Sequence, residues 1–415
     1  MVRVAVAGGS GGLGRVITQA IADGGEHEAI LLERELSLFR DLINYSDVSA
    51  IAEVLRSNDV QVVISAIGVL FEDTHRAQIN LIKGAAAAGT VTRFAPSEFG
   101  IDYIKARDNG FPYPLPGLQT YTVSQYKIEA VELLKTTKME YTRFIIGFLM
   151  DYYGFPAEPV PVVPLAVVLD VENLKAGIPG TGEETVTLTH SETIGKFVAA
   201  TLNATKWPEK SWIVGDIVTW NEALKLAEQV RDQKFDVSYD SVEALRRSEI
   251  TELPGNIPRY SIAPKPVLDG ILSLWSLGFV EGWFDLTKHV ESDQTVNDLH
   301  SDVPVIKLQE FLQRAWGKWS IWGGSCFILY LGHGSPWKTN LWKLSTLTQQ
   351  LVVWIIKDAV GPLTLFFKLG KLSATYTELD AQANALSTKN PRSLVEISQQ
   401  TTAEGNVISL VHGGF

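Results

Sequence analysis

The N-terminal stretch constrains the fold of this chain more than any other. An apolar run over 4–7 is short enough to be a buried strand, glycines follow at positions 8, 9, 11, 12 and 14, and apolar residues recur at helical spacing from Leu13. A strand, a glycine-rich turn and a helix in this order suit a pyrophosphate, because glycines admit close backbone approach and a helix N-terminus offers free N–H groups. We therefore predict a dinucleotide-binding loop here, with an ordinary flexible turn as the alternative.

Strand-like and helical patterns alternate through the first part of the chain. The strand-like runs lie over 28–32, 60–68, 91–94 and 140–146. This alternation predicts an α/β fold with a Rossmann-type doubly wound parallel sheet. The largely apolar run over 60–68 is typical of a central strand, and its end is expected over the ligand, because such sheets bind ligands at the carboxyl ends of their strands. The residues that we expect to contact the dinucleotide are Gly8, Ser10, Gly11, Gly12, Leu13, Gly14, Ser65 and Ala66.

The residues after the second predicted strand bear on whether the dinucleotide is NAD or NADP. Glu33, Arg34 and Glu35 follow that strand, about 20 residues beyond the last loop glycine, where this fold contacts the adenosine ribose. An acidic residue there favours the free 2′-hydroxyl of NAD, whereas an arginine favours the 2′-phosphate of NADP. Both residue types are present, so the local pattern alone leaves the choice open.

The remainder of the chain divides into less regular regions. A long loop over 101–123 is rich in proline and glycine, and prolines cluster again between 156 and 164. A smaller α/β pattern then continues to a short amphipathic helix over 308–316. We predict three regions: a dinucleotide-binding Rossmann domain over 1–150, a smaller substrate-binding α/β lobe over 151–316, and an irregular C-terminal extension of unknown role over 317–415.

Composition and charge narrow the class of protein. The chain has 415 residues and a formal net charge of −11, which argues against nucleic-acid binding because such a protein needs a basic face. One cysteine, Cys326, excludes an internal disulfide, and the seven histidines show no metal-ligand spacing. We identify no signal peptide and no uncharged apolar run of about 18 residues, so we expect a cytoplasmic protein without a membrane span or a metal site.

The C-terminal extension differs from the rest in composition. It carries eight basic and five acidic residues, although the whole chain is acidic. Five of the eleven tryptophans of the chain lie in it, at positions 319, 322, 337, 342 and 354. Two interpretations remain open: a patch for a membrane surface or a partner, and an aberrantly spliced or frame-shifted segment.

Several motifs together resemble a known family. The glycine loop over 8–14, the sequence Arg-Phe-Ala-Pro-Ser-Glu-Phe-Gly over 93–100 and a lysine in the following helix resemble the isoflavone reductase-like branch of the NmrA-like family. This family belongs to the atypical short-chain dehydrogenases. The residues over 214–222 look like its fungal members, and the resemblance covers about 1–316. It implies an NADPH-dependent oxidoreductase that reduces a small aromatic or polyketide-type molecule in fungal secondary metabolite biosynthesis.

The resemblance also implies roles for two residues. Arg34 matches the arginine that binds the 2′-phosphate, which favours NADPH, and Lys127 matches the catalytic lysine. Such a lysine can donate a proton to a substrate oxygen, and partial burial would lower its pKa toward the working pH. The usual Tyr-x-x-x-Lys pattern is absent, because Val123 lies four residues before Lys127. Lys127 is then the acid–base group, alone or with a hydroxyl from the substrate-binding lobe; the alternative is a solvated surface lysine.

A second function stays open beside the enzyme. A non-catalytic sensor would bind NAD(P) and control a transcription factor through protein contacts, and it would need no proton donor at Lys127. We expect Glu98 to shape the loop under the nicotinamide, His190 to begin a helix, and Tyr153 to be a core or rim aromatic residue. The expected ligand is a small molecule, and the sequence gives no oligomeric state.

Overall fold

The computed structural model describes most of the first 317 residues. The described ranges are 1–33, 41–42, 44–69, 71–112, 114–117, 122–158, 161–290 and 295–317, together with the backbone of three short strands after residue 350. Contacts divide the chain into one unit over Met1–Ser320 and a second over Ile321–Phe415. Each unit is described by itself.

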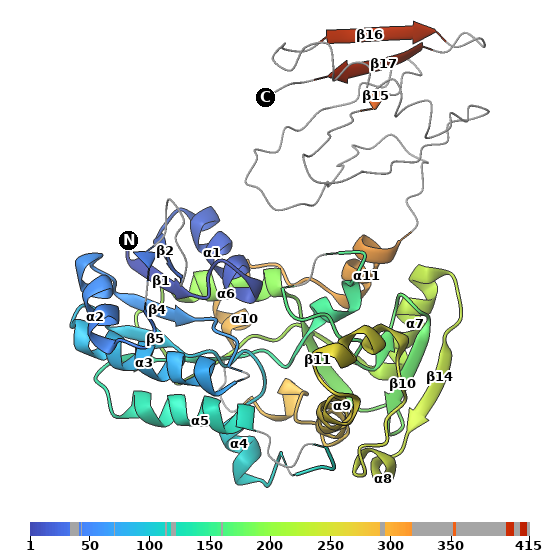
Figure 1. The fold of residues 1–415 in the computed structure, drawn as a ribbon, viewed down its shortest axis with the longest axis horizontal. Coiled ribbons are helices and arrows are strands. Elements are labelled where there is room, and N and C mark those ends of the chain that lie inside the picture. Colours follow the sequence, from blue (N-terminus) through green and yellow to red (C-terminus); the bar gives the residue numbers. More distant parts are fainter. Residues whose placement is uncertain are drawn as a thin grey trace. The chain divides into compact units, whose positions relative to one another are not determined.

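The first unit is built around a parallel sheet (Figure 1). Its strands, in the spatial order β3-β2-β1-β4-β5-β6, are β1 (Arg3–Ala7), β2 (Glu28–Glu33), β3 (Asp41–Leu42), β4 (Val62–Ser65), β5 (Arg93–Ala95) and β6 (Glu140–Tyr141). The order reverses between β1 and β4, which creates the switch point where such sheets bind ligands. One residue after β6, the strand β7 (Arg143–Ile145) pairs in parallel with β12 (Lys210–Trp212). The predicted Rossmann-type fold is confirmed.

Helices cover both faces of this sheet (Figure 1). The helices α1 (Gly12–Gly24) and α6 (Ser191–Thr201) share one core with Val4 and Val6, whereas α2 (Val48–Ser57), α3 (Glu72–Ala88) and α5 (Thr122–Lys135) share the other core with Ala5 and Ala7. Successive strand residues point to opposite faces, so a short apolar strand supplies both cores.

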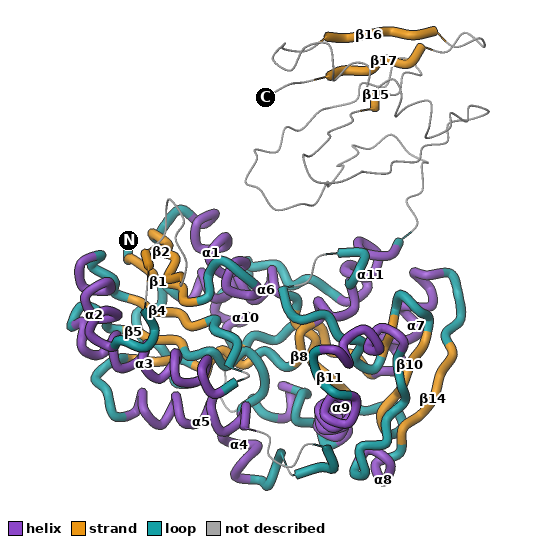
Figure 2. Tube along the Cα trace, viewed as in Figure 1, coloured by secondary structure: helices purple, strands orange, loops and turns teal. Residues whose placement is uncertain are grey.

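The second part of this unit has a separate hydrophobic core. Its strands are β8 (Phe148–Leu149), β9 (Leu169–Asp170), β10 (Lys175–Pro179), β11 (Thr185–Thr189), β13 (Asp216–Thr219) and β14 (Asp236–Asp240), and they form the sheets β13-β11-β8 and β14-β10-β9. Its helices, with α4 from the preceding loop, are α4 (Tyr103–Asp108), α7 (Trp220–Arg231), α8 (Val242–Leu245), α9 (Lys265–Val280) and α11 (Leu308–Trp316), and its 3₁₀ turns are η1 (Met150–Gly154) and η2 (Pro254–Ser261). Figure 2 shows the strands and helices of this part, among them β10, β14, α7 and α9. Two short elements between α9 and α11 pack elsewhere: Val296 of α10 (Val296–Leu299) joins the core of α1 and α6, and Leu286 of η3 (Leu286–Lys288) packs with Ile145 and Trp212. No helix among the described residues is long and apolar enough to cross a membrane.

The described residues of the second unit form three short strands. These are β15 (Val352–Val353), β16 (Glu396–Thr401) and β17 (Val407–His412), with β16 antiparallel and β15 parallel to β17. The predicted division of the chain at 150 and 316 stays a prediction.

Candidate functional site

The glycine loop packs against the end of the neighbouring central strand. Gly8 has φ +76°, and a Cβ atom there would lie 3.0 Å from the carbonyl oxygen of Ala66. A Cβ atom on Gly14 would lie 2.2 Å from the carbonyl oxygen of Gly8, which no side chain can tolerate. Only glycine therefore allows β1, α1 and the end of β4 to approach this closely.

The start of α1 is open to an anion. Ser10, Gly11 and Gly12 are exposed and Leu13 is half-buried. Within the described chain no side chain caps Gly11, and the first turn of α1 carries no acidic residue. The N–H groups of a helix start and the positive end of its dipole favour a phosphate at such a place.

The other predicted contacts of the dinucleotide divide into two groups. Ser65 is fully buried at the end of β4, and Ala66 follows it, half-buried beside the glycine loop. Arg34 lies outside the described residues. Its expected contact with a 2′-phosphate therefore stays a prediction, as do the roles of the other expected site residues.

In the part of the chain that the structure describes, buried polar atoms without a partner occur at the end of β4 and in the elements that follow β4 and β5 along the chain. Ser65 Oγ, Gln78 Nε2, Glu98 Oε2 and Ser124 Oγ have no hydrogen-bond partner among the residues described. The other amide atom of Gln78, Oε1, accepts a hydrogen bond of 2.8 Å from the backbone N–H of Ser97. Unpartnered buried polar atoms cost free energy, so a ligand with hydroxyl and amide groups would stabilise this edge of the sheet. The residues present therefore fit a nicotinamide dinucleotide.

Lys127 is buried, unlike a solvated surface lysine. This residue of α5 is 8% exposed, and its Nζ donates a hydrogen bond to the carbonyl oxygen of Glu98. Its Nζ also lies over the ring of Tyr103, 4.9 Å from the ring centroid. Phe99 has φ 35°, an uncommon conformation for a bulky residue, directly after the carbonyl that accepts this hydrogen bond. Such strain is typical of loops whose geometry is tied to a site.

Burial changes the proton affinity of this lysine. It lowers the pKa of Lys127 from 10.5 to about 8, because the charged form loses its hydration, and the negative charge of Glu98 offsets part of that effect. An acid–base group is most effective when its pKa lies near the working pH. Lys127 is therefore suited to proton transfer, which an ordinary surface lysine is not.

A buried network of charges holds the loop that contacts Lys127. Arg143 Nη1 lies 2.7 Å from Asp102 Oδ1 and 3.4 Å from Glu98 Oε1, and all three side chains are almost fully buried. Lys210 Nζ lies 2.9 Å from Asp102 Oδ2 and is partly exposed. The network thus connects β7 and β12 with the loop after β5.

The pKa values of the two carboxylates of this network shift in opposite directions. Burial raises the pKa of Glu98, and Arg143 and Lys127 offset only part of that rise. Burial would also raise the pKa of Asp102, but Arg143 and Lys210 together hold it below its ordinary value. Removing Arg143 would leave two carboxylates buried without their main partner, which is costly.

Sequence reasoning missed most of this surrounding network. Tyr103, Asp102 and Arg143 were not among the expected site residues. The one available signal was Arg143, a charged residue in the middle of the strand-like run 140–146, directly before three apolar residues. A charge at such a position has to find a buried partner.

Two secondary expectations are confirmed. His190 is the N-cap of α6, where its Nδ1 accepts a hydrogen bond of 3.2 Å from the N–H of Glu192. Burial and the nearby positive charge of Arg314 lower the pKa of His190 to about 4, so it is neutral near pH 7. Tyr153 is a core residue. No group of three metal-ligating side chains occurs within the described parts of the chain.

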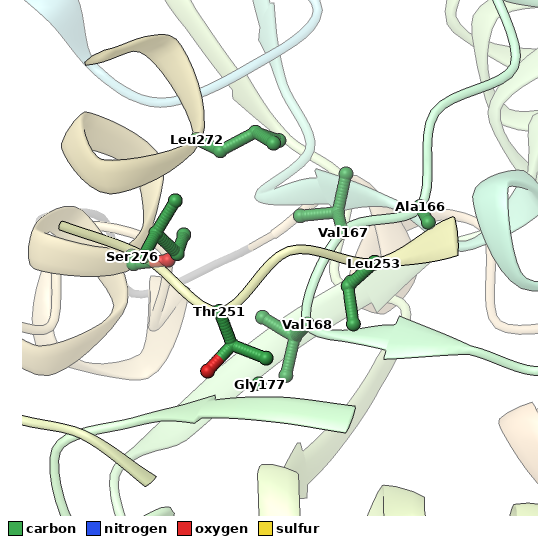
Figure 3. A pocket seen from close by; sticks show the side chains of 9 residues that line it. Ala166, Val167, Val168, Gly177, Thr251, Leu253, Leu272 and Ser276 are labelled. Atoms are coloured by element: carbon green, nitrogen blue, oxygen red, sulfur yellow. The ribbon is translucent and has the colours of Figure 1, made fainter. Parts of the chain in front are cut away.

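A small cavity lies elsewhere, in the second part of this unit (Figure 3). Val167, Val168, Leu253 and Leu272 supply much of its apolar lining. Its volume of about 10 Å³ suits no more than a water molecule. It shares no residue with the site around Lys127.

Comparisons with known proteins identify the family. No protein-family model matches the chain. The chain is 34% identical over 278 residues to oxidoreductase swnN of Metarhizium robertsii, which covers 62% of this chain and 81% of that protein. The chain belongs to the isoflavone reductase-like branch of the NmrA-like family. This reductase family also includes pinoresinol reductase 2 of Arabidopsis thaliana, 26% identical over 75% of this chain and 96% of that protein. The predicted resemblance and oxidoreductase class are confirmed.

Solved structures of the same reductase family share the fold. AtPrR2 with NADP⁺ and (+)-pinoresinol has a TM-score of 0.56 and 24% identity, and covers 75% of this chain and 98% of its own. The ternary complex of leucoanthocyanidin reductase from Vitis vinifera has a TM-score of 0.57 and 19% identity, with the same coverage. These likenesses support the Rossmann-type architecture of the first unit.

Proposed function

We propose that this chain is an NADPH-dependent reductase of a small aromatic or polyketide-type molecule, acting in fungal secondary metabolite biosynthesis. The observation that carries this proposal is the buried Lys127, held by the Glu98 carbonyl at the sheet edge where this fold binds dinucleotides. Relatives in fungi are oxidoreductases, and a leucoanthocyanidin reductase of the same fold was solved with NADPH.

Different residues of the chain would bind different parts of NADPH. The glycine loop and the start of α1 would hold the pyrophosphate, and Ser65 and Ala66 would lie beneath the dinucleotide. Arg34 would contact the 2′-phosphate, which distinguishes NADPH from NADH. When bound, NADPH supplies a hydride to the substrate.

Lys127 would handle the proton that accompanies this hydride. The protonated amine donates to the substrate oxygen on which negative charge develops, and solvent then returns a proton to the amine. Its pKa of about 8 keeps most of the side chain protonated near pH 7 while making the proton easier to release than that of a free lysine. The Glu98 carbonyl holds Nζ in one place for this transfer.

The experiment measures NADPH oxidation by the full chain with aromatic ketones, polyketide-type carbonyl compounds and lignans such as pinoresinol. We expect turnover with at least one class, and loss of turnover but retention of NADPH binding in Lys127→Ala. Undiminished activity in Lys127→Ala would refute the proposed mechanism. Binding of NADPH without turnover of any compound would favour the NAD(P)-sensing regulator that acts on a transcription factor.

A further inference from the structure

We propose that Tyr103 is a positioning residue for Lys127, whose ring holds the lysine ammonium group in the site. The chain lacks the tyrosine of the usual Tyr-x-x-x-Lys pattern, and a ring from another helix would replace it in this respect. This inference rests on the proposed function, because it assigns a role within the acid–base site. The evidence is the contact itself: Lys127 Nζ lies over the ring face, 4.9 Å from its centroid.

The far end of the Tyr103 ring lies against the loop after β5. A Cβ atom at position 100 would lie 2.6 Å from the Tyr103 hydroxyl oxygen, so Gly100 leaves the space that the phenol tip occupies. Gly100 is itself anchored, because its carbonyl oxygen accepts hydrogen bonds from the N–H groups of Ile146 and Gly147, at 2.9 and 3.1 Å. The ring therefore has a rigid support directly beside the loop that binds Lys127.

The backbone of Tyr103 is fixed by the buried charge network. Tyr103 is the first residue of α4, and Asp102 is the N-cap of that helix, with its side chain accepting a hydrogen bond of 3.3 Å from the N–H of Lys105. The same carboxylate binds Arg143 and Lys210. One network thus determines the positions of both α4 and the Glu98 loop, which meet Lys127 from two directions.

The surroundings of Lys127 make a ring contact effective. Glu98 reaches Lys127 from the loop after β5, and Asp102, Arg143 and Lys210 lie beyond it in the network. Between α3 and α5, His75 Nε2 lies 2.9 Å from Glu129 Oε2. A desolvated ammonium group gains more from an aromatic face than an exposed one does.

The geometry assigns this role to the ring face, because Nζ lies over the ring. Tyr103 also packs against the core of the second part of the unit, so the ring lies between that core and Lys127. Replacing the ring with an aliphatic side chain would keep the surroundings apolar but remove the attraction for the ammonium group. The lysine would then lose both its fixed position and part of its proton affinity.

Two substitutions at this position separate the ring from its hydroxyl group. Tyr103→Phe keeps the ring, so we expect kcat within about threefold of the parent, whereas Tyr103→Leu should lower kcat about tenfold with little change in the KM for NADPH. The alkaline limb of the Tyr103→Leu pH profile should move down by about one pH unit. Tyr126→Phe is the matched control, because Tyr126 precedes Lys127 on α5 but stacks on His75.

Direct titration makes the result independent of turnover. In ¹³C-lysine NMR of the free protein, the pKa of Lys127 should fall in Tyr103→Leu and stay unchanged in Tyr103→Phe and Tyr126→Phe. An unchanged pKa and kcat in Tyr103→Leu would overturn the inference while leaving the proposed reductase intact. Equal losses in Tyr103→Phe and Tyr103→Leu would overturn it too, since the hydroxyl would then be the required group. Absence of turnover in the parent would refute the proposed function alone, because the NMR arm would still test the ring contact.

Discussion

Replacing Lys127 with methionine is expected to stabilise the protein near pH 7 while abolishing turnover. Burial lowers the pKa of Lys127 from 10.5 to about 8, a shift that corresponds to a cost of about 3 kcal/mol for holding the ammonium group in the folded state. Methionine has a similar length and no charge, so it avoids this cost. It also leaves the Glu98 carbonyl without its donor, which costs about 1 kcal/mol. The net gain is then about 2 kcal/mol, or about 4 °C in Tm.

The pH dependence of this gain follows from linkage. The unfolded chain keeps the lysine proton up to a pH near 10.5, whereas the folded chain releases it at about 8. Between these values the unfolded state binds more protons, so this residue makes the parent more stable as the pH rises. The advantage of Lys127→Met should therefore be complete below a pH of about 8 and shrink steadily toward 10.5.

Urea unfolding of the parent and Lys127→Met at several pH values measures this difference. Lys83→Met is the matched control, because Lys83 is an exposed lysine of α3 and its replacement should change stability little at any pH. If the difference in the free energy of unfolding between the parent and Lys127→Met does not change with pH, the lowered pKa of Lys127 is refuted. A variant less stable than the parent at pH near 7 would refute the estimated cost of burial.

Four other predictions test the remaining parts of the site and the chain. Gly14→Ala should weaken NADPH binding at least about tenfold, because its Cβ would lie 2.2 Å from a loop carbonyl, whereas Gly24→Ala in the same helix meets nothing within 4 Å and should bind normally in a fluorescence titration. Arg34→Ala should weaken NADPH much more than NADH in the same assay, and equal losses would contradict the NADP assignment. Arg143→Met should destabilise the fold by about 3–5 kcal/mol in urea unfolding, since two buried carboxylates lose their main partner, and an unchanged midpoint would show that Arg143 contributes nothing to stability. Truncation after Ser320 should leave a folded protein that binds NADPH, because contacts divide the chain there; aggregation of the truncated chain would show that the extension completes the core.

The local elements of this protein could be predicted from its sequence. The apolar strand, glycine loop and helix at the N-terminus lie within 25 residues of one another, and their spacing carries the signal. The cap of α7 is equally local, since Thr219 and Glu222 exchange hydrogen bonds over three residues. Lys127 was found through its family motif, but the pattern of its helix did not distinguish a buried lysine from a solvated one. Short-range hydrogen bonds and side-chain periodicity act within a few residues, so the sequence by itself determined the local elements, the sheet class and the glycine loop between β1 and α1.

Only the tertiary structure decided what surrounds Lys127. Arg143 is 41 residues from Asp102 and 45 residues from Glu98 in the sequence, yet it contacts both. Lys210, on β12 still farther along the chain, contacts Asp102. Tyr103 reaches Lys127 from a separate short helix. None of these pairs has a spacing that marks it, because each depends on which strands become neighbours in the sheet. The burial of Lys127, and with it the lowering of its pKa, therefore follows from the packing of the whole sheet edge.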